Sequence, residues 1–338
     1  MQYNPALDGL RAVAVLAVVA FHCRLPFTGG GSIGVDLFFV LSGYLITSIL
    51  RSEVTETGTV SLGRFYWRRA LRLWPPLLLM LAAYAAVAPV LFPARDAVID
   101  TALAATYLTD YAMAFWHEPL MLGHTWSLSV EEHFYLLWPL VILATRSLSQ
   151  RALTVMLGVA FIAATAWRIA DAMIWQDWYR TYYRFDTRMS GLMLGGLIAV
   201  MPWRPKPETA GLVGRLAAYV LIVGLLISPF RSPGFIAWGG IIVDLAAGGL
   251  ILSVISTEGT RLHRLLTSRP LVYLGVISYS VYLWHYPLSR LLRYELPSSV
   301  TFLVVAGFAI VVAALSYEFI EKPLKSMRRR PAAPEGAI

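Results

Sequence analysis

The sequence has little of what soluble proteins and cysteine-based metal centres use. It holds one cysteine, Cys23, which excludes an internal disulfide and a metal cluster built from cysteines. Only 14% of its 338 residues are charged and 58% are hydrophobic, whereas a soluble domain carries about 25% charged residues. The mean hydropathy is +0.63. These shortages indicate a polytopic membrane protein.

Acidic residues are scarcer than basic ones, 20 against 28, which gives a formal net charge of +8. Nucleic-acid-binding proteins have a similar balance, but here the basic residues lie in short loops between apolar runs. That placement is the positive-inside pattern of membrane proteins. It favours contact with anionic lipid or an anionic small molecule, and it argues against a nucleic-acid partner.

Ten apolar runs are long enough to cross a bilayer. They lie at 8–23, 33–50, 70–92, 126–145, 152–171, 187–201, 213–230, 236–255, 271–290 and 299–319. A further run, 97–116, contains Asp100 and Asp110, and either crosses the membrane or lies at its interface. If it does not cross, the loops on the two sides hold 17 and 7 Lys and Arg. The sequence therefore predicts an all-α bundle of about ten membrane helices with both termini in the cytoplasm.

The first apolar run carries two residues that membrane helices normally avoid, Arg11 and His22. Their separation is about three turns of a helix, so both side chains project from one face, roughly 16 Å apart along the axis. An ionisable residue inside such a segment is costly, and by default it faces the protein interior and marks a functional site. In the alternative interpretation, each side chain extends to the nearer membrane interface.

Three carboxylates are candidate partners for this histidine. Asp36 lies just inside the second run, on the same expected outer side as His22, where it either orients the imidazole or caps its helix. Glu131 and Glu132 lie near the start of the run 126–145, and because neighbours on a helix point about 100° apart, at most one of them faces a given pocket. A carboxylate at that depth is expensive unless it is paired, which makes His22 an obvious partner.

Arginines cluster where the third run begins. Arg68 and Arg72 are four positions apart and Arg69 and Arg72 are three apart, so a helix presents them together. The loop charges place this cluster on the cytoplasmic side. A generic positive-inside anchor is the simpler interpretation, but the density of guanidinium groups favours a site that binds phosphates.

A polar and aromatic face follows in the run 271–290, where Ser278, Tyr282 and His285 share one side of the helix and end on the expected outer side. Together with Trp126, at the start of its own run, Tyr282 and His285 are candidate contacts for a substrate. An aromatic belt at the membrane interface explains the neighbouring Trp284 equally well.

At this point the motifs resemble acyltransferase family 3, the bacterial integral-membrane O-acyltransferases. The segments that carry the resemblance run in the family's order over nearly the whole chain: LDGLRAVAVLAVVAFH, GVDLFFVLSGYLI, RRALRLWP, TWSLSVEEHFYLLWP, RFDTRMSGLMLGG and SYSVYLWHYPL. Each is a weak signal alone, but six in order are specific. The chain departs from the pattern at His133, where glutamine is common.

The resemblance implies about ten membrane helices in the bacterial cytoplasmic (inner) membrane. It also implies transfer of an acyl group, often acetyl, from cytoplasmic acyl-coenzyme A to a sugar hydroxyl of an envelope or exported glycan or glycolipid. Carried over by motif, Arg11 and His22 are the essential pair, and Arg68, Arg69 and Arg72 contact coenzyme A. Some members continue into an extracytoplasmic hydrolase-like domain; we expect no relay through such a domain within this chain.

The residues fit that chemistry. Since a thioester is already activated, the enzyme must take a proton from a weakly acidic hydroxyl and hold the two reactants in line. A neutral His22 can serve as that base, with Glu131, Glu132 or Asp36 to orient it. In the alternative, an acyl-enzyme forms on His22 or, less favourably, on Cys23, which points about 100° away from the face of His22.

We therefore expect one membrane acyltransferase domain over 1–322, followed by a basic, disordered cytoplasmic tail over 323–338. The expected partners are acyl-coenzyme A, a glycan or glycolipid acceptor and membrane lipid, with no metal. The competing hypothesis is a transporter or flippase for a lipid-linked sugar. Transporters more often show repeat symmetry, and this sequence has no internal repeat, so the enzyme is favoured.

Overall fold

A computed structural model of the chain describes residues 3–92, 96–227, 232 and 234–327. The described residues form helices joined by short segments, with no strand among them, which confirms the predicted all-α class. The helices are α1 (Pro5–His22), α2 (Ile33–Thr57), α3 (Leu62–Leu91), α4 (Ala97–Ala105), α5 (Thr109–Trp116), η1 (Gly123–Thr125), α6 (Trp126–Ala144), α7 (Gln150–Trp175), α8 (Trp178–Tyr183), α9 (Phe185–Val200), α10 (Pro207–Ile227), η2 (Phe235–Gly239), α11 (Gly240–Ser256), α12 (Arg261–Leu266), α13 (Arg269–Val276), α14 (Ser278–Leu292), α15 (Ser298–Ser316), η3 (Tyr317–Glu321) and α16 (Lys322–Met327).

Seven helices in the described part of the chain are long and apolar enough to cross a membrane. They are α1, α2, α3, α7, α10, the helix Phe235–Ser256 and the helix Ser298–Leu324. These helices indicate a multi-pass membrane protein. The other predicted spans are not among these seven. α9 and α14 have only 16 and 15 residues, and α14 is separated from α13 at Ile277. α6 has 19 residues but carries Glu131, Glu132 and His133, which lower its hydropathy. The ten crossings and the cytoplasmic termini remain predictions.

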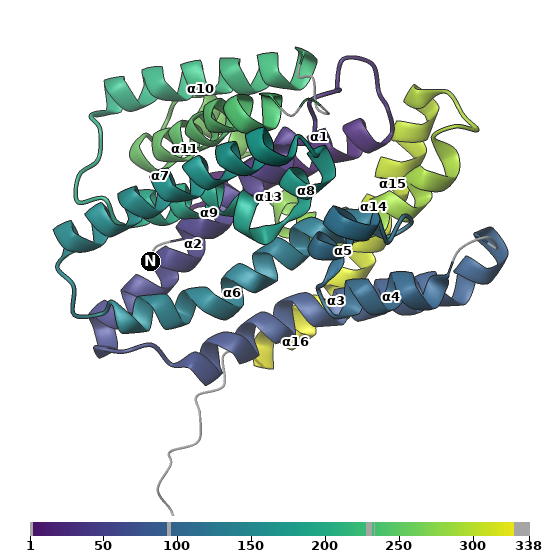
Figure 1. The fold of residues 1–338 in the computed structure, drawn as a ribbon, viewed down its shortest axis with the longest axis horizontal. Helices are drawn as coiled ribbons and strands as arrows, with labels where there is room; N and C mark the ends of the chain where they lie inside the picture. Colours follow the sequence, from purple (N-terminus) through teal and green to yellow (C-terminus); the bar gives the residue numbers. More distant parts are fainter. Residues whose placement is uncertain (1–2, 93–95, 228–231, 233, 328–338) are drawn as a thin grey trace, which may run out of the picture.

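The run 97–116 forms two short helices in place of one long one. α4 has 9 residues and α5 has 8, and the chain between them contains Tyr107 in the left-handed conformation. A single membrane span needs about 20 residues, so neither helix crosses alone. α4 lies beside α3, where the Tyr84 hydroxyl donates a hydrogen bond to the buried Asp100 (Figure 1). That the run does not cross the membrane remains a prediction.

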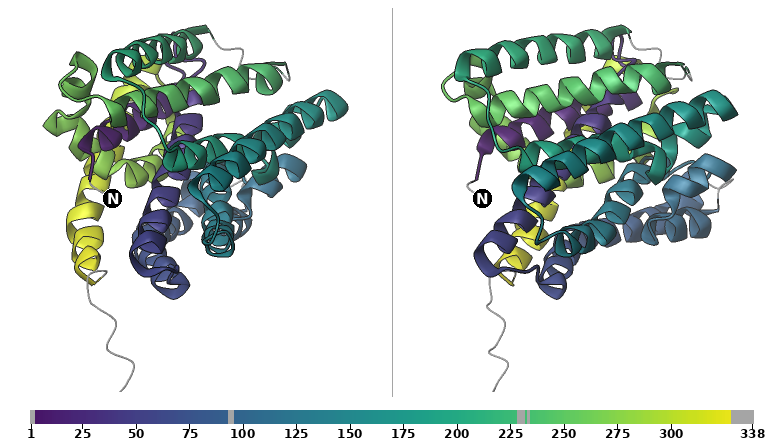
Figure 2. Two further views of the ribbon diagram at one scale, coloured as in Figure 1. Left: turned by 90° about the vertical axis from the view of Figure 1, so that its left-hand side faces the viewer. Right: turned by 60° about the vertical axis from the view of Figure 1, so that its left-hand side comes forward.

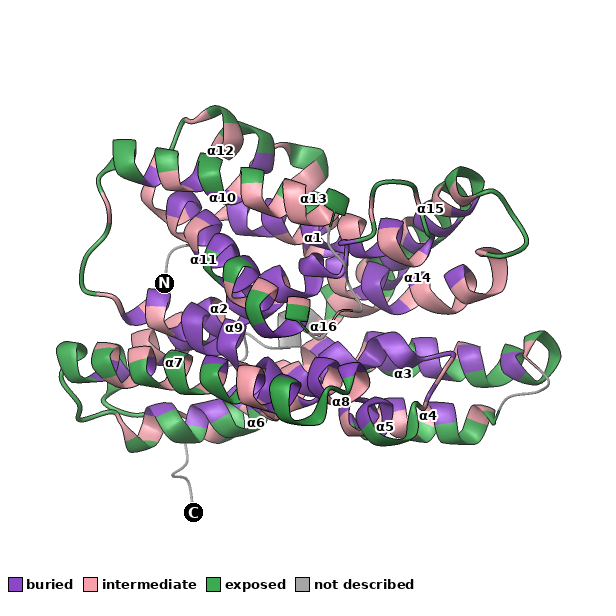
Figure 3. Cartoon of the chain, turned by 45° about the horizontal axis from the view of Figure 1, so that its top comes forward, coloured by how far each residue is buried: buried purple, intermediate pink, exposed green. Residues whose placement is uncertain are grey.

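α1 and α2 occupy the centre of the bundle. Of their membrane-length segments, 61% and 78% of the residues are buried, against 22% for α7 and 17% for α10. Figures 1 and 2 place α10 at one edge and α3 with α4 at the opposite edge, with α1 and α2 between them. Figure 3 shows the same division, with buried residues concentrated on the inner helices and exposed residues on the outer ones. Any site built on α1 and α2 therefore lies inside the protein.

Two close backbone contacts fix these central helices. Gly195 of α9 faces α2, and a Cβ there would lie 2.0 Å from the Val40 carbonyl oxygen. Gly275 of α13 faces α1 in the same way, with a Cβ position 1.8 Å from the Asp8 carbonyl oxygen. Only glycine allows such an approach, because it has no Cβ.

The first residues of the expected disordered tail, 323–338, are helical. They belong to α16 (Lys322–Met327), which continues the last long helix. The remainder of the tail, 328–338, lies outside the described residues.

We predict that reporter fusions truncated at residues 95 and 120 will report the same, outer, side of the membrane, and that a fusion at 148 will report the cytoplasm. The loop charges and the broken run 97–116 both lead to this expectation. Alkaline phosphatase and fluorescent-protein fusions measure it. Opposite signals from the 95 and 120 fusions would refute the ten-crossing topology.

We also predict that Gly195→Ala destabilises the folded protein, since the added methyl group collides with the backbone of α2. Overpacking of this kind costs about 1–3 kcal/mol or more. The thermal midpoint of the detergent-solubilised protein should fall. Gly158→Ala in α7 is the matched control, because no atom lies within 4 Å of its Cβ position. Equal midpoints for the two variants would contradict the packing.

Candidate active site

Two cavities meet inside the bundle. The first, which we call the Glu131 pocket, has a volume of about 350 Å³ and is lined by Arg11, Arg69, Arg72 and Glu131 among others. The second, the His22 pocket, has a volume of about 410 Å³ and is lined by His22 and a group of aromatic and arginine side chains. Val35 and Tyr282 line both cavities. They form the shared wall.

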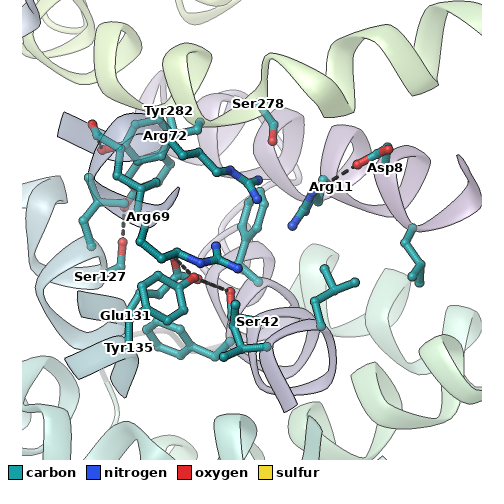
Figure 4. A pocket seen from close by; sticks show the side chains of 18 of the residues that line it. Asp8, Arg11, Ser42, Arg69, Arg72, Ser127, Glu131, Tyr135, Ser278 and Tyr282 are labelled. Carbon is teal, nitrogen blue, oxygen red and sulfur yellow. Dashed lines mark hydrogen bonds and ion pairs between the residues drawn. The ribbon is translucent and has the colours of Figure 1, made fainter. Parts of the chain in front are cut away.

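Three guanidinium groups enter the Glu131 pocket. Arg11 comes from α1, Arg69 and Arg72 come from α3, and Figure 4 shows all three directed into the same space. Arg69 lies over the ring of Tyr135, 4.9 Å from its centroid, which holds the guanidinium in place. Arg11 pairs with Asp8 at 3.0 Å. Such a cluster suits a ligand with several negative charges.

Glu131 is the carboxylate that faces this pocket. The Ser42 hydroxyl donates to one of its oxygens at 2.6 Å and the Tyr135 hydroxyl donates to the other at 3.1 Å (Figure 4). Glu132 points elsewhere and does not line either cavity in the described part of the chain. The helical geometry of α6 thus separates the two neighbours, as their 100° offset requires.

Arg68 does not reach the pocket that Arg69 and Arg72 line. Its side chain is exposed, on the other side of α3. On this helix the (i, i+3) pair shares the cavity, and the third arginine faces outward. Of the three arginines predicted to form one cluster, Arg69 and Arg72 point into the cavity and Arg68 points outward.

The segment before α1 contributes to the lining of the Glu131 pocket. Tyr3 lines the cavity and donates a hydrogen bond to Asp8 at 2.7 Å. Burial and this hydrogen bond raise the pKa of Tyr3 to about 12, so its hydroxyl stays protonated at neutral pH. Asp8 thereby connects Tyr3 to Arg11 and fixes the direction of the guanidinium.

His22 is hydrogen-bonded to another histidine. Its Nδ1 lies 2.9 Å from Nε2 of His285, and Nδ1 of His285 lies 2.6 Å from the carbonyl oxygen of Tyr282. A carbonyl can only accept, so Nδ1 of His285 carries a proton and donates it. In the neutral ring Nε2 is then an acceptor, and Nδ1–H of His22 donates to it. This order leaves the lone pair of His22 on Nε2.

A third histidine, His124, supports the same region. Pro287 has no N–H, so the Leu283 carbonyl one turn earlier in α14 loses its usual helical partner. His124 supplies a replacement, with its Nε2 3.2 Å from that oxygen. The ring of Tyr286 contacts both His22 and His124, at centroid distances of 4.8 and 4.7 Å. The sequence analysis did not assign His124 to the site. Pro287, inside a predicted polar helix, is the feature of the sequence that indicates a carbonyl in need of another partner.

Tyr282 is held firmly at the shared wall. Its hydroxyl donates to the His124 carbonyl at 2.7 Å and therefore accepts from the Ser127 hydroxyl at 2.7 Å. Trp126, which lines the His22 pocket, packs against the ring of Tyr182 at 4.9 Å. Of the predicted substrate contacts, Trp126 and Tyr282 line the cavity, whereas His285 is fully buried behind His22.

The structure does not bring the predicted carboxylates to His22. Asp36 pairs with Arg188 of α9 at 2.5 Å, and Glu131 lies in the other pocket. A buried arginine needs a counter-ion, and Arg188 is paired with Asp36, the carboxylate that was predicted to orient His22. The orienting partner of the imidazole is His285, on a helix that the spacing of residues could not place next to α1.

The described residues contain no group of three or more His, Cys, Asp or Glu side chains arranged to hold a metal ion. Cys23 is fully buried and lines neither cavity in the described chain. The polar groups of the site thus include imidazoles, hydroxyls, guanidinium groups and the carboxylates of Asp8 and Glu131.

Fold and site together define a helical membrane protein in which a cationic cavity and a histidine-containing cavity share one wall. The sequence comparison agrees with this class: the model of the acyltransferase domain family matches residues 4–318. The chain belongs to acyltransferase family 3, as its motifs indicated.

Curated relatives are similar over almost the whole chain. The peptidoglycan O-acetyltransferase OatA of Listeria monocytogenes is 31% identical over 351 residues, which cover 96% of this chain and 56% of that protein. The O-acetyltransferase OatA of Staphylococcus aureus (strain NCTC 8325) is 32% identical over 350 residues, covering 96% of this chain and 57% of the relative. The chain therefore spans a little over half the length of these relatives. No solved structure matches it.

Proposed function

We propose that this chain is a membrane O-acetyltransferase that moves an acetyl group from acetyl-coenzyme A, bound from the cytoplasm in the Glu131 pocket, to a sugar hydroxyl in the His22 pocket. The observation that carries the proposal is the shared wall of Val35 and Tyr282, with a phosphate-binding set of arginines on one side and a histidine base on the other. The names of the relatives support acetyl as the group and peptidoglycan as a candidate acceptor.

The donor is a multiply charged molecule whose reactive thioester ends a long, flexible and mostly uncharged arm. Arg69 and Arg72 bind its phosphates, while Arg11 lies on α1 toward the interior. Apolar side chains of α2, including Phe38, Leu45 and Ile49, line the rest of the Glu131 pocket and suit the arm. Glu131 offsets part of the positive charge and holds Tyr135 beneath Arg69.

The transfer needs one proton acceptor at the hydroxyl. Nε2 of His22 takes the hydroxyl proton as the sugar oxygen attacks the carbonyl carbon of the thioester. The tetrahedral intermediate collapses, the C–S bond breaks, and the departing thiolate takes the proton back from His22. His285 keeps the lone pair of His22 on Nε2 by accepting from Nδ1–H, the role that a carboxylate has in many catalytic triads. Asp36 and Glu132 have no part in this scheme.

The experiment that tests the proposal is acceptor-dependent release of free thiol from acetyl-coenzyme A by the purified protein in lipid nanodiscs, with mass spectrometry of the glycan product. Release of thiol that follows the addition of peptidoglycan oligosaccharides supports the enzyme. A protein that binds the glycan and never acetylates it would instead support the transporter or flippase.

We predict that the double variant Arg69→Ala, Arg72→Ala binds acetyl-coenzyme A about ten- to a hundred-fold more weakly, since a charge-assisted contact contributes about 1.5–3 kcal/mol. Arg68→Ala is the matched control, because its side chain is exposed and outside the pocket. Calorimetry or a filter assay measures the affinity. Wild-type affinity in the double variant, or an equal loss in the control, would remove the donor from this cavity.

We predict that His22→Ala lowers the rate of acetyl transfer by about 10²–10⁴-fold, the usual cost of losing a general base. Donor binding should be retained, since the arginines are in the other pocket. Cys23→Ala is the control next in sequence and should transfer normally. Near-normal transfer by His22→Ala would show that the imidazole is only an interfacial anchor.

The same assay separates positioning from base chemistry at His285. A glutamine there can still accept from Nδ1–H of His22 through its side-chain oxygen, whereas leucine cannot. His285→Gln should therefore retain much more activity than His285→Leu at similar protein levels. An acetylated form of the protein, seen as a mass shift on His22 after incubation with donor alone, would establish the acyl-enzyme route instead of direct transfer.

A further inference from the structure

The His22 pocket is lined by three arginines and by no carboxylate. Arg24 follows α1, and Arg290 and Arg293 lie at the end of α14, so the three come together from distant parts of the chain. None of them forms an ion pair within the described residues. The Nε atoms of Arg290 and Arg293 are buried and have no hydrogen-bond partner there.

Three fully buried arginines outside the two cavities are paired with carboxylates. Arg168 bonds Asp244 at 3.0 Å, Arg184 bonds Asp171 at 2.9 Å and Arg188 bonds Asp36 at 2.5 Å. This is the rule for a charge removed from water, which is costly unless a partner compensates it. The arginines of the His22 pocket are less buried, with Arg24 exposed and Arg290 and Arg293 half-buried. They line a space that a ligand can enter and that no acidic side chain of the described residues lines, so an anionic ligand can pair with them there.

The negative end of α14 attracts cations in its last turn, and this accounts for an arginine at position 290. It does not explain why Arg290 and Arg293 line the same cavity as His22 while no carboxylate of the described residues does. It also does not explain Arg24, which belongs to a different segment.

An aromatic ring holds two of the three guanidinium groups in place. Tyr294 lies 4.8 Å from the guanidinium carbon of Arg24 and 5.2 Å from that of Arg293, measured to the ring centroid. Arg24 adopts a left-handed backbone conformation, with φ of 58°, in the turn that carries its side chain to the pocket. The cations are therefore organised before any ligand arrives, which lowers the entropic cost of binding an anion.

The same cavity has surfaces for sugar rings. Trp178, Tyr179 and Tyr183 of α8 line it, together with Tyr286 beside His22. Flat aromatic faces pack against the apolar faces of sugars, so α8 provides a platform between the arginines and the base. The pocket thus combines three elements: a base, an aromatic platform and an uncompensated positive charge.

We propose that Arg24, Arg290 and Arg293 form an anion subsite, and that the acceptor is an acidic glycan whose carboxylate or phosphate binds there while a nearby hydroxyl meets Nε2 of His22. This inference rests on the proposed function, because it defines the substrate class of the same pocket. The anion is either a carboxylate on the sugar itself or the diphosphate of a lipid carrier. Both use the same guanidinium chemistry.

The test compares acceptors with and without a negative charge. N-acetylglucosaminyl-N-acetylmuramic acid carries a free carboxylate, its N-methylamide does not, and chitobiose is a neutral disaccharide; the polyprenyl-diphosphate-linked disaccharide supplies phosphate. Steady-state acetyl transfer from acetyl-coenzyme A is measured with wild-type protein and with Arg290→Gln and Arg293→Gln in nanodiscs. Arg146→Gln, an exposed arginine that lines neither cavity, controls for net charge.

We expect KM for the anionic acceptors to rise about ten- to a hundred-fold in Arg290→Gln and Arg293→Gln, with little change in kcat, and KM for chitobiose to stay constant. A large effect of amidation identifies the carboxylate as the ligand, and a preference confined to the lipid-linked substrate identifies the diphosphate. Equal use of charged and neutral acceptors, unchanged in the two variants, overturns the anion subsite while leaving acetyl transfer intact. Absence of thiol release with every acceptor rejects the proposed function instead.

Discussion

The contact between α1 and α13 determines where the chemistry of this protein lies. Gly275 brings α13 against the backbone of α1 at Asp8, with no room for a side chain between them. α14 follows directly, so His285 meets His22 at the far end of the same helix. Because α1 is a rigid rod, fixing its beginning and its end places Arg11 in one cavity and His22 in the other. A single helix thus sets the distance between the two cavities.

The interior has two kinds of region: one in which buried arginines are paired with carboxylates, and one in which arginines outnumber the carboxylates around them. Between α7, α9 and α11, Arg168 is paired with Asp244 and supported by the Ser190 hydroxyl, so this part is a closed structural network. In the two cavities, positive charge exceeds negative charge, and the excess is stabilised only by aromatic rings and by one or two carboxylates. The excess of positive charge in the two cavities therefore marks places where anionic ligands can bind, whereas Arg168 already has its carboxylate partner.

The sequence alone could place the elements that depend on local periodicity. The eleven-residue spacing of Arg11 and His22 predicts a shared stripe, and both residues do line cavities on the inner side of α1. The spacing of Arg69 and Arg72 likewise predicts the pair that shares one pocket. Local periodicity also explains why only one of Glu131 and Glu132 could enter it.

The partners of these residues could not be predicted, because periodicity fixes a face and not the helix that covers it. His285 is 263 positions from His22, and nothing in either segment indicates that they touch. Asp36 and Arg188 are 152 positions apart, and the ion pair depends on how closely Gly195 allows α9 to approach α2. The run 271–290 was predicted as one helix for a related reason, since hydropathy does not register the break at Ile277 between α13 and α14.

The shared wall has a consequence for the membrane as an electrical insulator. With mouths on opposite sides, as the proposed transfer requires, two hydrated cavities approach each other until only Val35 and Tyr282 separate them. The hydroxyl of Tyr282 is tied to the His124 carbonyl and to Ser127, so this barrier is anchored on both sides. In the proposed transfer an acyl group would pass at a point where protons and ions must be held back, so a rigid Tyr282 would preserve the cell's ion gradients during the reaction.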